Sequence, residues 1–262
     1  MKNICSKVKN TFKWLFDIKD WKLVSKNVPA LNITLFVVSV VIMNLMASKT
    51  IIMTEPSWLG ITGGIILSWI PFLCMDTVTR VFGPRVSTKL NIFALIVNLA
   101  CIGIFQLVAS VQVGGESGAY AAFDATFTQT WQIFVASSIA FVLSGIVNNF
   151  SNAFIARLFK KNPNGYGCYI ARTYISTAVG QFVDNFVFTG LAFLVFFNLS
   201  VGSTMGWTIL TVLGTAAFGA VLELVMEIIF SPIGYRMSNK WINNNIAGSY
   251  LEYAREMNYV RA

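Results

Sequence analysis

The stretch from residue 171 to residue 197 is long and apolar enough to cross a lipid bilayer, yet it carries a polar stripe. About 20 apolar residues suffice to span the hydrocarbon core. One face of the predicted helix carries residues that recur at every fourth position: Arg172, Ser176, Gly180 and Asp184. A carboxylate near the middle of a membrane helix costs roughly 2.5–3.5 kcal/mol on insertion scales, so it normally faces a partner or a wet cavity. The stripe therefore predicts either a structural contact between helices or, as we favour, a pathway for a solute.

The composition of the chain is typical of an integral membrane protein. Of its 262 residues, 56% are hydrophobic and 11% are charged, whereas about 25% are charged in a soluble domain. Hydrophobic runs place six spans at 30–52, 60–82, 88–112, 131–158, 168–198 and 207–232. We expect an all-α integral membrane protein in which residues 29–235 form one six-helix transmembrane domain. Residues 1–28 would precede it as a basic amphipathic segment, and residues 236–262 would follow it as a tail.

The basic residues, which give the chain a net charge of +8, mark the orientation of these spans. The loops 113–130 and 199–206 contain no Lys or Arg, whereas basic residues gather in segments 80–89 and 157–161 and in both terminal segments. Because positively charged loops stay on the cytoplasmic side, both termini are expected there. Lysines mixed with Phe and Trp in residues 1–28 are typical of a helix lying on the cytoplasmic leaflet, although a loosely ordered basic tail is an open alternative. The charge therefore indicates contact with membrane lipid and not with nucleic acid.

Several kinds of chemistry have no matching pattern in the sequence. The chain has no His, and its four Cys residues stand far apart without a Cys-x-x-Cys pair. No phosphate-binding Gly-x-x-x-x-Gly-Lys-Ser/Thr loop occurs. We find no nucleophile paired with a base. We therefore expect no enzyme, no metal site, no cofactor and no ATP-driven pump in a single chain.

Polar positions within the spans hint at an internal duplication. Three pairs of residues are 108 positions apart: Asn44 with Asn152, Lys49 with Arg157, and Asp76 with Asp184. Three spans separate the members of each pair, so the two halves would have opposite orientations in the membrane. Inverted repeats of this kind place a substrate site near the midplane, between the halves. The third and sixth spans show no such match, so an inverted repeat of three plus three spans and a coincidence of three polar positions both stay open.

Polar residues of the second and fourth spans follow helical spacing. Asp76 and Arg80 are four residues apart and can pair on one face, or anchor the end of the helix at the cytoplasmic surface. Asn148 and Asn152 share a stripe in the fourth span. Amides of this kind commonly form hydrogen bonds between neighbouring helices, so each could be structural or could bind a ligand.

The sixth span holds two carboxylates one helical turn apart, Glu223 and Glu227. Such a pair repels when both groups are ionised. Either one of them holds a proton or a cationic partner approaches. A purely structural role explains this pair poorly.

Several motifs resemble one known family. The segments MDTVTRVFG at 75–83, RTYISTAVGQFVDNFVF at 172–188 and EIIFSPIGY at 227–235 resemble the queuosine precursor transporters, also called the vitamin uptake transporter family, and NLMASK at 44–49 is similar to a stretch of that family. The likeness covers about residues 30–240. It implies an importer in the bacterial cytoplasmic (inner) membrane for 7-deazaguanine bases, from which the tRNA nucleoside queuosine is made. The residues that match motif positions are Asn44, Lys49, Asp76, Arg80, Arg172, Ser176, Gln181 and Asp184.

The chemistry of such a base suggests roles for the polar residues. A deazaguanine presents adjacent N–H donors that one carboxylate can accept, and amides suit its carbonyl and ring nitrogen. We expect Asp184 or Glu227 to recognise the base, with Asn148, Asn152 and Gln181 as orienting amides. Candidates for stacking on the flat ring are Trp69, Phe72 and Phe186. Glu223 departs from the resemblance, because members of the family often have Lys at its position, so the exact substrate stays open.

The expected function is import of a small nucleobase-like substrate by alternating access around a polar pocket at the midplane. The first alternative is the substrate-binding subunit (S-component) of an ECF-type vitamin importer, whose ATPase module would be a separate partner. The second is a membrane scaffold that transports nothing. A homo-oligomer and the identity of any coupling ion also stay open.

Overall fold

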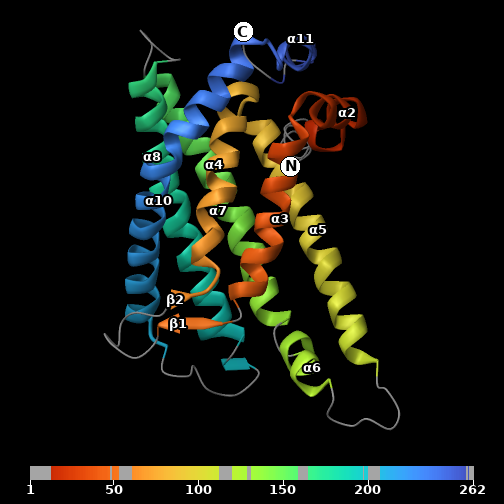
Figure 1. Ribbon diagram of the computed structural model, residues 1–262, viewed down its shortest axis with the longest axis vertical. Helices are drawn as coiled ribbons and strands as arrows, with labels where there is room; N and C mark the ends of the chain where they lie inside the picture. The colour runs from red at the N-terminus through yellow and green to blue at the C-terminus, as the bar shows by residue number, and fades with distance from the viewer. Residues whose placement is uncertain are drawn as a thin grey trace, which may run out of the picture.

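Six long helices form the body of the protein. The computed structural model describes residues 13–47, 49–52, 61–111, 120–128, 131–158, 165–196, 198–199, 207–257 and 259. The helices long and apolar enough to cross a membrane are α3 (Ala30–Ala47), α4 (Ile65–Phe82), α5 (Pro84–Ser110), α7 (Trp131–Leu158), α8 (Tyr166–Thr189) with its π-helical continuation η2 (Gly190–Phe196), and α10 (Ile209–Asn243). They lie side by side in one bundle (Figure 1). The prediction of an all-α integral membrane protein with six spans is confirmed.

Short elements occupy the two ends of the bundle. A helical turn, η1 (Lys13–Phe16), precedes α2 (Ile18–Asn27), which packs against α11 (Gly248–Glu256) at one end. The antiparallel strands β1 (Thr50–Ile52) and β2 (Ile61–Thr62), together with α6 (Ala121–Thr128), lie at the other end (Figure 1). We call these the clasp end, after α2 and α11, and the hairpin end, after β1 and β2. The first and last described helices, α2 and α11, therefore lie at the same end of the bundle, and the cytoplasmic location of that end stays a prediction.

The turn from α4 to α5 is set by two adjacent residues. Gly83 has φ of 89°, a conformation that a residue with a Cβ rarely adopts, and it ends α4. Pro84 follows at the first position of α5, where its missing N–H and fixed φ suit the start of a helix. This pair allows α5 to begin at once and to return along α4.

The sixth span is longer than the sequence predicted. Its expected end at residue 232 is wrong, because α10 continues through Pro232 to Asn243. A proline inside a helix leaves the carbonyl four residues earlier without its N–H partner. Here the hydroxyl of Ser231 donates to the carbonyl oxygen of Ile228 at 3.3 Å, which replaces the lost bond. The boundary expected after residue 235 therefore falls inside this helix.

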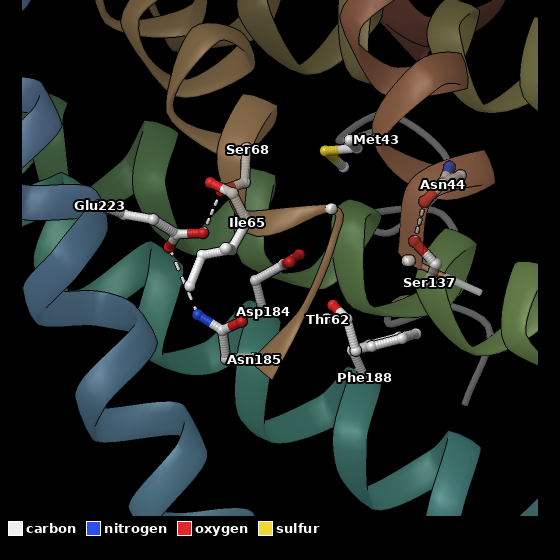
Figure 2. Close-up of a pocket in the computed structure, with 12 residues that line it drawn as sticks. Met43, Asn44, Thr62, Ile65, Ser68, Ser137, Asp184, Asn185, Phe188 and Glu223 are labelled. Atoms are coloured by element: carbon white, nitrogen blue, oxygen red, sulfur yellow. Dashed lines mark hydrogen bonds between the residues drawn. The ribbon is translucent and has the colours of Figure 1, made fainter. Parts of the chain in front are cut away.

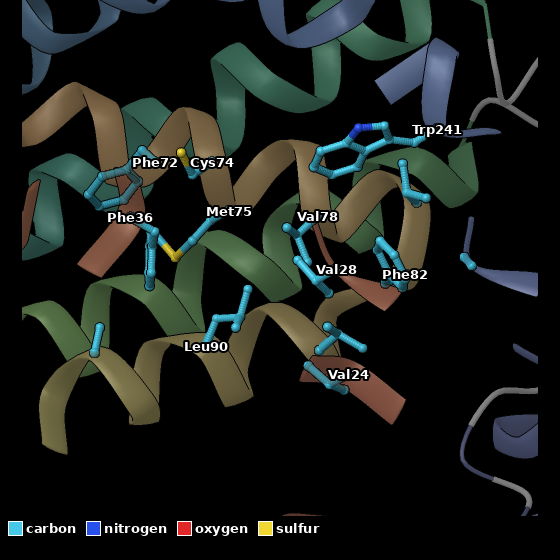
Figure 3. Close-up of a cluster of buried hydrophobic side chains, with 14 of the residues drawn as sticks. Val24, Val28, Phe36, Phe72, Cys74, Met75, Val78, Phe82, Leu90 and Trp241 are labelled. Atoms are coloured by element: carbon cyan, nitrogen blue, oxygen red, sulfur yellow. The ribbon is translucent and has the colours of Figure 1, made fainter. Parts of the chain in front are cut away.

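The buried apolar core is concentrated toward the clasp end. Figure 3 shows side chains of α2, α3, α4, α5 and α10 meeting there, among them Val24, Phe36, Phe82 and Trp241. Many apolar side chains on the outer faces of the spans, such as Ile104 and Phe154, are exposed, as expected for surfaces that meet lipid. The core fixes α2 to the bundle, while the polar residues of the spans are turned inward.

The two halves run in opposite directions but pack differently. The helices α3 and α7 point in opposite directions, as do α4 and α8 (Figure 1). However, α10 packs against α8 and α4, whereas α5 packs against α7, α4 and α3. The inverted repeat therefore stays a prediction.

Candidate functional site

A cavity lies between five of the spans, toward the hairpin end. Its unfilled space amounts to about 340 Å³ only when the open solvent that it meets is counted with it. Ala47 at the end of α3, Thr62 of β2 and Gly64 form part of its wall, which places it near the hairpin. Its other polar wall residues are Asn44, Ser68, Ser137, Asp184, Asn185 and Glu223 (Figure 2). The cavity is thus polar although the helices around it are apolar.

Two carboxylates from different helices meet at this cavity. Asp184 of α8 accepts a hydrogen bond from the Ser144 hydroxyl at 2.7 Å. Glu223 of α10 accepts one from the Ser68 hydroxyl and one from Asn185 Nδ2, the latter at 3.3 Å. The two acids lie close enough for their charges to interact. This wall therefore attracts hydrogen-bond donors and positive charge.

The opposite wall supplies an amide. Asn44 of α3 accepts a hydrogen bond from the hydroxyl of Ser137 on α7, as Figure 2 shows. Its Nδ2 group has no hydrogen-bond partner among the described residues. The cavity therefore combines acceptors on α8 and α10 with an amide donor on α3.

A second polar cluster, the Asp76 network, consists of Asp76, Asn148, Asn152, Arg172 and Thr177. Oδ1 of Asp76 accepts from Asn148 Nδ2 at 3.0 Å and from Asn152 Nδ2 at 2.8 Å, and its Oδ2 accepts from the Thr177 hydroxyl at 3.4 Å. Arg172 Nε donates to Asn152 Oδ1 at 2.7 Å, so this amide links an acid to a base. All five side chains are buried. They join α4, α7 and α8 without lining the cavity.

Arg80 is placed away from both clusters. Its guanidinium donates to the hydroxyl of Ser238 and to Asn239 Oδ1, the latter at 2.7 Å. It also lies over the rings of Tyr169 and Tyr235, at 5.0 and 4.7 Å from their centroids. These contacts attach the end of α4 to α10 and α8, an anchoring role that the sequence offered beside the pairing with Asp76.

The predicted stacking residues do not line the cavity. Trp69 stacks on Phe230 with ring centroids 4.0 Å apart, and Phe72 is 1% exposed within the core. Phe186 is 40% exposed and faces outward beside Phe182. Phe188 is the aromatic side chain in the cavity wall, and sequence reasoning missed it. Its position four residues after Asp184, on the same helical face, was the signal that could have found it.

Glu227 and Gln181 lie behind the cavity wall, deep in the bundle. Both are fully buried. Gln181 Nε2 donates to the Ser68 carbonyl oxygen at 3.4 Å, while its Oε1 and both carboxylate oxygens of Glu227 have no hydrogen-bond partner among the described residues. The structure thus brings Asp184 and Glu223 to the cavity but separates them from the predicted amides Asn148 and Asn152.

The comparisons with known proteins agree with this architecture. A family model described as "Putative vitamin uptake transporter" matches residues 62–237. The match runs from β2 into α10 and so includes both acids of the cavity and the Asp76 network. No curated protein and no solved structure matches the chain significantly. The chain belongs to the vitamin uptake transporter family and is a multi-pass membrane transport protein.

Proposed function

We propose that this transporter imports a 7-deazaguanine base, a precursor of queuosine, through the cavity at the hairpin end. The observation that carries the proposal is the pair of acids, Asp184 and Glu223, which share one polar cavity with the amide of Asn44. In this proposal the hairpin end faces the outside of a bacterial cytoplasmic membrane and the clasp end faces the cytoplasm.

The hydrogen-bonding edge of a deazaguanine is complementary to this wall. Its ring N–H and exocyclic amino group are adjacent donors, which the Asp184 carboxylate can accept together. The Asn44 amide can donate to the carbonyl oxygen of the base, and the Phe188 ring offers an apolar face. A precursor that bears an aminomethyl cation would also gain from the second acid, Glu223. The proposal thus assigns base recognition to Asp184 rather than to Glu227.

Transport would proceed by alternating access. The cavity is bordered by the hairpin, whereas buried contacts of the Asp76 network and of Arg80 hold the helices together toward the clasp end. In this proposal the arrangement is assigned to the state that receives substrate from outside. Import then requires the helices to separate at the clasp end after the hairpin end has closed.

The proposal can be tested by binding and uptake with one matched pair of variants. Purified protein is screened by thermal shift against the cyano and aminomethyl forms of 7-deazaguanine; a ligand at a hundredfold excess over its Kd stabilises the folded state by about 2.7 kcal/mol. Asp184→Asn loses one charged hydrogen-bonding partner, worth roughly 1.5–3 kcal/mol, so its affinity should fall about 10- to 150-fold. Asp124→Asn, on α6 outside the cavity wall, is the control. Equal affinity of Asp184→Asn and the wild type would refute the assigned site.

Uptake into liposomes separates the alternatives. We expect the chain alone to import the base. Uptake that appears only with an added ATPase module would identify a substrate-binding subunit instead. A deletion strain that salvages queuosine precursors as well as its parent would favour a scaffold.

A further inference from the structure

Glu227 is a buried acid whose surroundings do not suit a negative charge. It is 0% exposed, and neither carboxylate oxygen accepts a hydrogen bond from the described residues. An ionised carboxylate in such a place has no compensation for its lost hydration, and in practice it takes up a proton. The position lies one helical turn beyond the cavity residue Glu223 on α10.

Among the described residues, no basic group on the helices packed against Glu227 compensates its charge. From α4, Asp76 and Cys74 lie within reach of its charge, and from α8 the phenol of Tyr169 does. Of these groups, Asp76 is the charged one, and its charge has the same sign. Arg172 donates to Asn152 and acts on Asp76. Of the two neighbouring acids, Asp76 and not Glu227 is therefore the one whose charge Arg172 compensates.

The hydrogen bonds of Asp76 and Glu227 differ in how well they stabilise an ionised carboxylate. Asp76 accepts from Asn148, Asn152 and Thr177, and donors of this kind stabilise a carboxylate. Glu227 receives none from the described residues, so its surroundings favour the neutral acid. The proton that the pair must hold therefore resides on Glu227.

Polar groups continue from the cavity to the level of Glu227. Asn185 on α8 contacts Glu223 on α10, and these two helices run in opposite directions. Gln181 lies one turn from Asn185, and Glu227 lies one turn from Glu223, both toward the clasp end. Gln181 Nε2 also donates to the main-chain carbonyl oxygen of Ser68, and the hydroxyl of the same residue donates to Glu223. A proton that enters the cavity therefore finds hydrogen-bonding groups up to the level of Glu227.

We propose that Glu227 is the proton-coupling site of this transporter. It takes up one proton from the hairpin end and releases it at the clasp end with each molecule of substrate. The only bond made and broken is the O–H bond of the carboxylic acid, and the process moves one proton and one substrate molecule in the same direction. The proposal rests on the transport function of the family, and the proposed base serves as its probe.

Infrared spectroscopy tests the protonated acid without any substrate. Protein reconstituted in lipid at neutral pH should absorb at the C=O stretching frequency of protonated carboxyl groups, and Glu227→Gln should lose the share of one acid from this absorption. Glu252→Gln, which removes an exposed acid on α11, should keep it. An absorption undiminished in Glu227→Gln would overturn the proposal, whether or not the base is the substrate, because any band from the buried acid Glu223 is common to both proteins.

Transport under a pH gradient tests the coupling. With the membrane potential clamped, one proton per neutral 7-cyano-7-deazaguanine predicts about tenfold accumulation for a gradient of one pH unit. A pH dye inside the liposomes should record proton entry when the base is added to the wild-type protein, and Glu227→Gln should accumulate no base above its external concentration. Accumulation by Glu227→Gln equal to that of the wild type, or accumulation driven by sodium instead, would overturn the proposal. If no 7-deazaguanine binds to the wild type, the proposed substrate is refuted, and the infrared result then tests whether Glu227 carries the proton.

Discussion

Replacing Lys89 with Met should weaken the docking of α2 at neutral pH and much less in acid. Lys89 on α5 and Asp20 on α2 form an ion pair with exposed fractions of 0% and 1%. The rings of Trp14 and Trp21 lie over the ammonium group, at 5.7 and 4.9 Å. The Met side chain preserves most of the apolar stem, but it leaves the carboxyl group of Asp20 buried without its paired ammonium group, and of the basic side chains only the weaker, more distant effect of Arg85 then acts on it among the described residues.

The magnitude follows from the protonation of Asp20. Removing one partner of a buried pair typically costs about 3–5 kcal/mol. The unpaired carboxylate can escape this cost by taking up a proton. For a carboxyl whose ordinary pKa is 3.8, protonation costs about 4.4 kcal/mol at pH 7 and about 1.6 kcal/mol at pH 5, at 1.36 kcal/mol per pH unit. These values are the upper limits of the loss in stability. Burial already raises the pKa of Asp20 against the opposing effect of Lys89. An acid whose pKa is raised on folding destabilises the folded state increasingly as pH rises above the unfolded value, so Lys89→Met should lose most at neutral pH.

Trp14 and Trp21 provide the measurement, since their fluorescence should change when α2 leaves the bundle. Urea titrations at pH 5 and pH 7 would compare Lys89→Met, Asp20→Asn and the double variant, with Lys22→Met at an exposed site of α2 as the control. The double variant should recover much of the loss, because it leaves no unpaired charge. A loss below about 1 kcal/mol at pH 7, or the same loss at both pH values, would refute the reasoning.

Three further changes test the packing and the clasp. A Cβ at Gly180 would lie 2.8 and 2.9 Å from side chains of α4 and α7, so Gly180→Ala should destabilise the protein by about 1–3 kcal/mol in thermal unfolding, whereas Gly167→Ala, with nothing within 4 Å, should not. Asn152→Ala removes the amide that joins the acid and the guanidinium of the Asp76 network and should cost roughly 3 kcal/mol in chemical unfolding; a loss within 0.5 kcal/mol would show that the network is not stabilising. Burial of Asp17 opposes its ionisation, but hydrogen bonds from two tyrosines, Tyr253 among them, hold its pKa below the usual 3.8. This contribution is present above pH 3.8 and is lost as pH falls, so the protection factors of the α11 amides, which correct for the intrinsic exchange rate, should decrease in acid in the wild type and less so in Tyr253→Phe.

The spans could be predicted from the sequence because the bilayer imposes a minimum apolar length and the basic loops impose an orientation. The end of α10 could not be predicted, since a proline normally ends a helix. Here the Ser231 hydroxyl replaces the hydrogen bond that Pro232 removes, and helical spacing does not reveal this contact. The first span ends at Ala47, before the expected residue 52, because Thr50 to Ile52 pair with β2. Hydropathy cannot distinguish an apolar strand from the last turn of a helix.

The candidate site was predictable in part. An acid inside a span must face a partner or a cavity, and this argument led to Asp184, which does line the cavity. The sequence does not reveal how each helix is rotated about its axis, and that rotation turns the predicted stacking residue Phe186 outward. Helical spacing offers Arg80 either a pairing with Asp76 or an anchoring role, but it does not reveal the anchor: α10 brings hydroxyl, amide and carbonyl groups to Arg80 from 155 to 159 residues away. Rotation and long-range partners are tertiary properties, so helical spacing alone does not determine them.

The same helical spacing explains why the cavity and the Asp76 network are separate. Ser68, Phe72 and Asp76 follow one another at every fourth position of α4, so Phe72 lies between the cavity and the network. On α8, Gly180 lies one turn from Asp184 toward the clasp end. A Cβ at Gly180 would lie 2.8 Å from the Phe72 ring, so the ring already rests against the backbone of α8 at this level. In the proposed transport cycle, a flat base held at Asp184 would meet this contact on its way to the clasp end. Its passage would require α4 and α8 to move apart at Gly180, where the lack of a side chain leaves few atoms to separate.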